Sequence, residues 1–228
     1  MVGAPPLSST PWRNARWLVL APHPDDETLG AGALIAEVAA EGRLAGIAYL
    51  TDGTGSHSHD GAASRARLKA LRRTEAAAAC RILSRSPRLP IFLDWPDAQP
   101  FEPGSAGWSD TVSQLAAFCR RERVDAVAVT ASAEPHCDHA AAGDLARAVA
   151  EAALRPVSVF EYCVWGQPPL TSRAFTTKRI APGRRRAALV AHRSQLTPSF
   201  GDGFRLPPDQ QTMPDRDRLY LRSRHGAS

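Results

Sequence analysis

Two short clusters in the sequence combine histidines with carboxylates, the side chains that bind divalent metal ions. Residues 23–27 read HPDDE and residues 136–139 read HCDH. His23 and Asp26 are three positions apart across a turn that opens a predicted helix, so both side chains can face one ion. His139 from the second cluster can supply a third ligand. Two imidazoles and one carboxylate leave a coordination position for water, which is typical of a catalytic metal site.

The other polar residues of the two clusters suit the hydrolysis of a carbonyl compound. A bound metal ion lowers the pKa of its water towards about 7, which makes hydroxide available at neutral pH. Asp25 stands next to a ligand and can act as the general base on that water. His136 can donate a proton or a hydrogen bond to the oxyanion that forms, and Asp138 can hold His136 in the required tautomer. A single histidine or an Asp-Asp pair before a helix is usually structural, so the hypothesis depends on both clusters meeting.

The elements that carry these clusters alternate between apolar runs and helical patterns. Strands followed by helices of ten or more residues indicate βαβ units and a parallel sheet. We therefore predict a doubly wound, Rossmann-like α/β fold with a mostly parallel sheet and helices on both faces. The expected strands are residues 16–21, 46–50, 89–93, 124–130 and 157–164, and the expected helices are 29–41, 65–83, 109–122, 140–154 and 183–192.

The predicted topology brings the two clusters together. In a sheet with an order near 3-2-1-4-5, the first and fourth strands are neighbours, and strand order reverses between them. The HPDDE cluster follows the first predicted strand, and the HCDH cluster follows the fourth. Ligands bind beyond the carboxyl ends of such strands. We therefore expect the two loops to face each other across one site.

The motifs resemble those of the N-acetylglucosaminyl deacetylase family that includes the PIG-L and LmbE-like proteins. Residues 21–27 (APHPDDE) match the first motif of that family, and residues 136–139 (HCDH) match the second. The resemblance extends from about residue 17 to about residue 206. It includes LTDG at residues 50–53, the pair Arg72 and Glu75, and HRSQ at residues 192–195. Cys137 departs from the pattern, since proline is common there, and we expect only a small change in loop stiffness.

The resemblance implies roles for individual residues. It implies that three residues are zinc ligands, that Asp25 is the general base, that His136 assists the oxyanion and the leaving amine, and that Asp138 tunes His136. It also implies a substrate-binding role for Arg72. His192 either borders the pocket as a substrate-binding residue or pins the end of a helix. The implied zinc ligands are His23, Asp26 and His139.

These observations predict a hydrolase with one Zn²⁺ per chain, although Fe²⁺ or Co²⁺ would also suit the ligands. It would remove an N-acyl group, N-acetyl in particular, from an amino sugar or a glycoconjugate by means of metal-bound hydroxide. One alternative is another single-metal hydrolase or an oxygenase, since two histidines and a carboxylate also bind non-haem iron. Another is a non-catalytic sugar-binding homologue. The chain lacks the GxGxxG and GxxxxGK[ST] motifs of nucleotide-binding folds.

Composition limits the remaining possibilities. The 228 residues fit a single domain (1–228), with an N-terminal extension at 1–15 and a C-terminal cap or tail at about 197–228. The net charge of +5 comes from scattered arginines, which argues against a nucleic-acid partner. No apolar stretch reaches the roughly 18 residues of a membrane span, and no secretory signal begins the chain, so we expect a cytoplasmic protein. A homo-oligomer is compatible with the sequence.

Three residues outside the clusters also have alternative interpretations. Asp97 either lies at the rim of the pocket or forms a turn, and the turn is favoured. Trp165, after the fifth predicted strand, is favoured as a packing residue over a platform for a sugar. His57 lies in a polar loop and is expected to be exposed to solvent.

Overall fold

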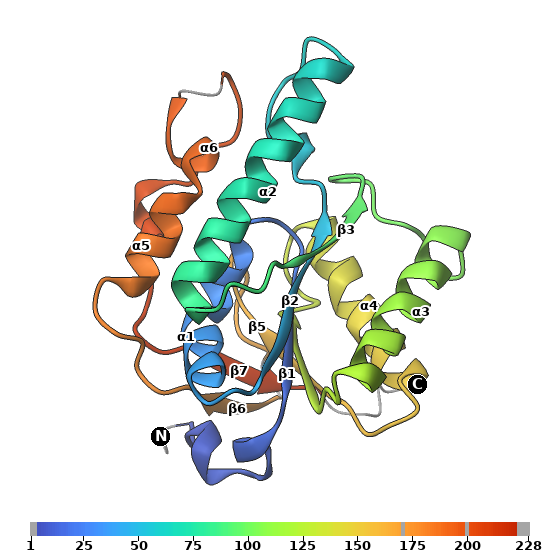
Figure 1. Ribbon diagram of the computed structural model, residues 1–228, viewed down its shortest axis with the longest axis vertical. Helices are drawn as coiled ribbons and strands as arrows, with labels where there is room; N and C mark the ends of the chain where they lie inside the picture. Colours follow the sequence, from blue (N-terminus) through green and yellow to red (C-terminus); the bar gives the residue numbers. More distant parts are fainter. Residues whose placement is uncertain (1–3, 170–171, 199–200, 223–228) are drawn as a thin grey trace.

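The computed structural model describes residues 4–169, 172–198 and 201–222 (Figure 1). Parts of the predicted terminal regions, residues 1–3, 199–200 and 223–228, lie outside this range. The strands of the sheet are β1 (Trp17–Ala21), β2 (Leu44–Thr51), β3 (Ile91–Trp95), β4 (Ala126–Thr130), β5 (Ser158–Tyr162), β6 (Arg173–Thr176) and β7 (Arg218–Leu221). The α-helices are α1 (Asp26–Ala40), α2 (Ala62–Ser84), α3 (Ala106–Arg121), α4 (Cys137–Ala152), α5 (Arg184–Ala191) and α6 (Arg193–Leu196).

The sheet has the order β3-β2-β1-β4-β5-β7-β6. Its first five strands are parallel, which confirms the predicted doubly wound α/β fold and the 3-2-1-4-5 order. β7 runs antiparallel to β5 and to β6, and both β6 and β7 come from the part of the chain where the sequence pattern weakens. The region after residue 197 therefore contributes a strand to the sheet.

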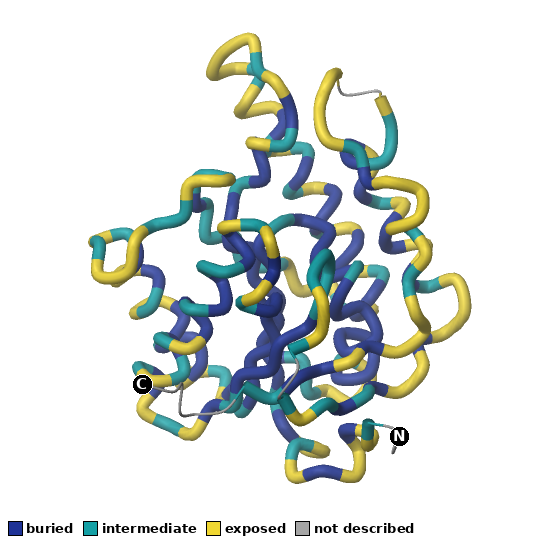
Figure 2. Tube along the Cα trace, turned by 180° about the vertical axis from the view of Figure 1, so that it is seen from behind, coloured by how far each residue is buried: buried dark blue, intermediate teal, exposed yellow. Residues whose placement is uncertain are grey.

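Helices cover both faces of the sheet because the parallel strands are apolar on both faces (Figure 1). Successive residues of β1 alternate between two hydrophobic cores. Trp17 and Val19 pack with α1, α2 and α5, whereas Leu18 and Leu20 pack with α3 and α4. Figure 2 shows the central strands as buried chain, with exposed residues mainly at the loops and the outer faces of the helices.

The switch in strand order lies between β1 and β4. The two strands pair in parallel, with Leu18 opposite Val127 and Leu20 opposite Val129. Their following loops therefore leave the same edge of the sheet side by side, as the sequence predicted.

One strand begins later than expected. The predicted third strand started at Leu89, but Leu89 is 69% exposed, and β3 begins at Ile91, after Pro90. Proline has no amide hydrogen for the ladder. β3 ends at Trp95, and Asp97 lies in the loop that follows, at the same edge of the sheet as the two predicted clusters.

The N-terminal segment packs against the sheet. Trp12 makes edge contacts with Phe160 and Phe175, at ring-centroid distances of 5.1 and 5.3 Å, and its indole N–H donates to Ser158 Oγ at 3.0 Å. Leu7 is also buried. The described part of the predicted extension is thus fixed to β5 and β6.

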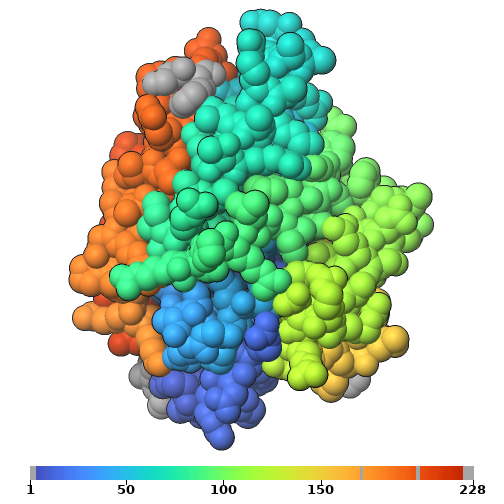
Figure 3. Space-filling model, in the orientation of Figure 1, coloured from blue at the N-terminus to red at the C-terminus, as the bar shows by residue number. Residues whose placement is uncertain are grey.

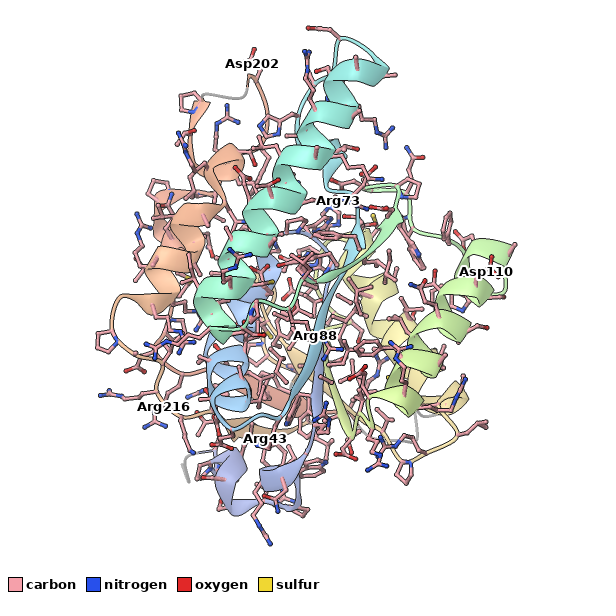
Figure 4. The ribbon with its side chains drawn as sticks, in the orientation of Figure 1. Arg43, Arg73, Arg88, Asp110, Asp202 and Arg216 are labelled. Atoms are coloured by element: carbon pink, nitrogen blue, oxygen red, sulfur yellow. The ribbon has the colours of Figure 1, made fainter. Side chains whose placement is uncertain are left out.

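Three of the arginines labelled in Figure 4, Arg43, Arg88 and Arg216, come from three different segments of the chain, before β2, β3 and β7. None of the helices in the described ranges has the length and apolar character needed to cross a membrane.

Close packing of α1 on the sheet depends on Gly30. A Cβ at this position would overlap the ring of Tyr162 in β5 and lie 3.2 Å from the carbonyl oxygen of Cys163. We expect Gly30→Ala to lower the free energy of unfolding by about 1–3 kcal/mol through overpacking. Denaturant-induced unfolding measures this change. A gain of about 1 kcal/mol, as an unhindered helical glycine would give, would contradict the described packing.

Candidate active site

A cavity of about 450 Å³ opens at the carboxyl ends of the parallel strands. Imidazoles and carboxylates from the loops after β1, β3 and β4 line one side of it, and Trp165 and Phe204 belong to its apolar lining. Two loops that are distant in sequence, residues 54–58 and 202–205, pair at its edge through a bridge between His57 and Gly203. Figure 3 shows these two parts of the chain together at the top of the molecule.

His23, Asp26 and His139 converge within this cavity. The Nδ1 of His23 and the Nε2 of His139 each lie 3.3 Å from the same carboxylate oxygen, Asp26 Oδ2. The side chain of His139 is fully buried, yet neither of its ring nitrogens has a hydrogen-bond partner among the described residues. Buried polar groups are normally paired. The Nδ1 faces the carboxylate of Glu134 at 3.5 Å, whereas the Nε2 faces Asp26, so the unpaired Nε2 fits a ligand of a cation.

Two carboxylates determine which nitrogen of His23 faces Asp26. The Nε2 of His23 lies 2.9 Å from Asp138 Oδ2 and 3.3 Å from Asp97 Oδ1. Burial alone would lower the pKa of His23, but its hydrogen bonds to Asp138, Asp26 and Asp97 outweigh burial and raise the pKa well above the ordinary value. The two acceptors retain the proton on Nε2, so a metal ion would take the place of the proton between Nδ1 and Asp26.

Asp25 combines an unusual backbone with a perturbed carboxyl group. Its φ of 130° lies in a region that favours glycine, and its amide donates to Glu27 Oε2 at 2.9 Å. Its carboxylate accepts a hydrogen bond from the side-chain amide of Gln195. Burial and the neighbouring charge of Asp26 raise the pKa of Asp25 to about 7. A carboxylate with such a pKa suits proton transfer near neutral pH.

A buried network behind Asp25 holds this segment. His192 is fully buried, and its Nε2 lies 3.1 Å from Glu27 Oε1. Glu75 accepts from the amide of Ser194 at 2.9 Å and from its hydroxyl at 2.6 Å. His192 is not among the residues that line the cavity, so its position does not fit direct contact with a substrate. It fits the alternative of a residue that pins the start of α6.

Arg72 reaches the cavity from α2, but its hydrogen bonds go to loops. Its guanidinium donates to the carbonyls of Gly53 and Pro24 and to Ser56 Oγ, the last two at 3.0 and 3.1 Å. Gly53 has a φ of 68°, and a Cβ there would lie 2.7 Å from Arg72 Nη1. The guanidinium therefore ties the loop after β2 to the loop after β1.

His136 lies at the cavity, at the start of α4. Its Nδ1 accepts from the amide of Asp138 at 3.2 Å, which places the proton of the neutral ring on Nε2. Burial and the nearby His23 lower the pKa of His136. Asp138 Oδ2 is 3.9 Å from His136 Nδ1 but 2.9 Å from His23 Nε2. The nearer imidazole partner of Asp138 is thus His23, whereas the sequence pointed to His136. Cys137 is exposed.

Residues outside the two motifs also contribute to the site, and the expectation that His57 is exposed was wrong. Asp97 lies in a turn, as favoured, which is closed by a hydrogen bond from the amide of Gln99 to the carbonyl of Pro96, and it also lines the cavity. Burial opposes ionisation of its carboxyl, but hydrogen bonds from His23 and Gly55 outweigh burial and hold its pKa at about 2. His57 is buried, with 7% exposure, because it packs under the loop that contains Gly203. Glu134, which the sequence did not single out, lies 3.5 Å from His139 Nδ1. The only signal for it is a carboxylate two residues before the HCDH motif.

The motifs and this geometry agree with a family comparison. The model of the family described as PIG-L, GlcNAc-PI de-N-acetylase, matches residues 18–150. The chain belongs to the PIG-L family. The matched range includes both clusters and the first four strands of the sheet. The search of curated proteins gives no match.

Solved structures share the fold of this PIG-L family member. The conserved protein TT1542 from Thermus thermophilus is 31% identical, with 79% of this chain and 80% of that chain covered and a TM-score of 0.58. The N,N'-diacetylchitobiose deacetylase from Pyrococcus horikoshii is 22% identical over 84% and 75% of the two chains, with a TM-score of 0.65. The zinc-inhibited form of teicoplanin deacetylase Orf2 is 17% identical over 90% and 97%, with a TM-score of 0.61.

The backbone at Asp25 gives a test of local strain. We expect Asp25→Gly to be more stable than Asp25→Ala by at least about 1 kcal/mol, because only glycine adopts this φ without steric cost. Both variants lack the carboxylate, so their difference in free energy of unfolding isolates the backbone. Equal stabilities, or a less stable glycine variant, would show that the backbone at this position is relaxed.

Proposed function

We propose that this PIG-L family member is a zinc-dependent hydrolase that removes an N-acyl group, N-acetyl in particular, from an amino sugar or its conjugate. The observation that carries the proposal is the convergence of His23 and His139 on Asp26, directly beside the buried carboxyl of Asp25. We also propose that residues 1–228 act as one domain, with the segment around Phe204 covering part of the cavity.

His23, Asp26 and His139 would hold one metal ion per chain, and Fe²⁺ or Co²⁺ would fit the same donors. When bound, the ion polarises the acyl carbonyl and lowers the pKa of water. Burial opposes the negative charge of Asp26, but the two imidazoles outweigh burial and lower its pKa, so the carboxylate stays ionised as a ligand must.

Asp25 would transfer the proton, and His136 would stabilise the negative charge that develops on the carbonyl oxygen. Asp25 takes a proton from the attacking water as the water oxygen bonds to the acyl carbon. The N–H at Nε2 of His136 donates a hydrogen bond to the carbonyl oxygen as negative charge develops there. When the carbon–nitrogen bond breaks, the amine nitrogen takes up the proton that Asp25 took from the water, and an acid and a free amino sugar are released.

The rest of the cavity supports a substrate larger than the acyl group. Its volume of about 450 Å³ lies within the usual range for small-molecule sites. Trp165 and Phe204 make an edge-to-face pair at 6.1 Å on its apolar side, which suits the apolar face of a sugar ring or an aglycone. Among proteins with this fold are deacetylases named for diacetylchitobiose and for teicoplanin. In this proposal Arg72 shapes the substrate pocket by fixing its loops.

The activity is tested by screening purified protein for amine release from N-acyl amino sugars and their conjugates. We expect Asp25→Asn to lower turnover about 10²–10⁴-fold, the usual contribution of a general base. Asp110→Asn, on the exposed side of α3, serves as the matched control and keeps full activity. Turnover retained by Asp25→Asn would reject the assignment of the base.

Metal removal tests the cofactor separately. We expect a chelator to abolish amine release, and one equivalent of Zn²⁺ per chain to restore it, because the ligand set offers one position. Oxygen exclusion should leave the rate unchanged. A rate that survives chelation would refute metal dependence, and a rate that requires oxygen would favour an iron oxygenase.

A further inference from the structure

Glu134 is a buried carboxylate that the proposed reaction does not use. It lies between β4 and α4, and its side chain is fully buried. Its Oε1 accepts from the amide of Val164 at 2.7 Å, and its Oε2 accepts from the amide of Trp165 at 2.9 Å. The same Oε2 lies 3.5 Å from His139 Nδ1. One carboxylate therefore contacts both a proposed metal ligand and the turn after β5.

The charge of Glu134 has few partners. A buried carboxylate is costly unless it is paired and hydrogen-bonded. In the ion pairs found among the described residues, its single partner is His139. Both of its oxygens accept backbone N–H groups, so the side chain acts as a hydrogen-bond acceptor on both sides.

An acceptor at this position selects one tautomer of His139. The proton belongs on Nδ1, which faces Glu134, and the lone pair belongs on Nε2, which faces Asp26 Oδ2 at 3.3 Å. Carboxylates that receive the second N–H of a metal-binding histidine orient the ring and make it a stronger donor.

The other contacts of Glu134 fix the wall of the cavity. The turn that it binds carries Trp165, which lines the cavity and meets Phe204 at an interplanar angle of 88°. There is little room beside the carboxylate, since a Cβ added to Gly166 would lie 3.3 Å from Glu134 Oε1.

We propose that Glu134 is a positioning residue that acts at two places: through His139 on metal affinity, and through the turn of residues 164–166 on the placement of Trp165. The second action rests on the proposed function, because it concerns a substrate. The first concerns this chain's own affinity for a metal ion.

Glu134→Gln is the test variant, because it keeps the shape of the side chain. Its amide oxygen can still accept from Val164, but its NH₂ group then faces the amide of Trp165 and His139 Nδ1 with a donor. We expect zinc affinity, measured by competition with a chromophoric chelator, to fall about 10–100-fold. We also expect KM for an N-acyl amino sugar to rise.

Two further variants separate the two actions. Glu161→Gln is the matched control, because Glu161 is a buried carboxylate that accepts from the amide of Ser132 at 3.2 Å and pairs with Arg222, away from the cavity lining. It should leave zinc affinity unchanged. Trp165→Ala should raise KM while leaving zinc affinity unchanged.

Unchanged zinc affinity in Glu134→Gln, or an equal fall in Glu161→Gln, would overturn the proposal. If Glu134→Gln does not fold, the ring ¹⁵N spectrum of the unaltered, zinc-loaded protein decides: a proton on Nδ1 of His139 supports the inference, and a proton on Nε2 overturns it. Zinc binding is measured without substrate. A fall in affinity without any deacetylation would therefore reject only the proposed function, whereas absence of zinc binding to the unaltered protein would reject both.

Discussion

The parallel pairing of β1 with both β2 and β4 is the constraint on which the site depends. Because β1 has a parallel neighbour on each side, the chain must cross to the other half of the sheet before β4. The loops after β1 and β4 then leave the same edge as neighbours. Residues more than a hundred positions apart, such as Asp26 and His139, meet over the buried apolar core. Displacement of either strand would separate the ligands without altering them.

Three consecutive carboxyl groups are buried at the site, and their negative charge must be balanced by neighbouring histidines. Asp25, Asp26 and Glu27 are consecutive, and each is at most 3% exposed. Burial opposes ionisation of all three, but their partners differ. Two imidazoles keep Asp26 ionised, and His192 lowers the pKa of Glu27, whereas the charge of Asp26 adds to burial at Asp25 and raises its pKa. Neighbouring carboxyl groups thus acquire different pKa values, so that one can stay ionised as a proposed metal ligand while the next can exchange a proton as a proposed base.

The sequence was sufficient for those features that depend on local pattern and on strand order. Apolar runs, helical spacing and the two motifs predicted the parallel core of the sheet and the convergence of His23, Asp26 and His139. The hydrogen-bond and ion-pair partners of these residues could not be predicted from the sequence, because they depend on the directions in which the side chains point. Asp97, two residues after the end of β3, and Asp138, in the first turn of α4, both turn their carboxylates to His23 Nε2. The strands β6 and β7 are short and antiparallel, and their four-residue patterns are too brief to identify from the sequence.

The late part of the chain contributes to the position of Asp25, the proposed base, because the first motif does not hold this side chain by itself. Asp25 has a strained φ and receives a hydrogen bond from Gln195, which follows the end of α5. Gln195 is in turn fixed by neighbours on both sides, since His192 contacts Glu27 of α1 and Ser194 contacts Glu75 of α2. Strained conformations persist only where the surroundings over-determine them. The position of the Asp25 carboxyl group therefore depends on the first motif and on residues 192–195 together, and a fragment limited to the two motifs would contain the proposed ligands without the support for the proposed base.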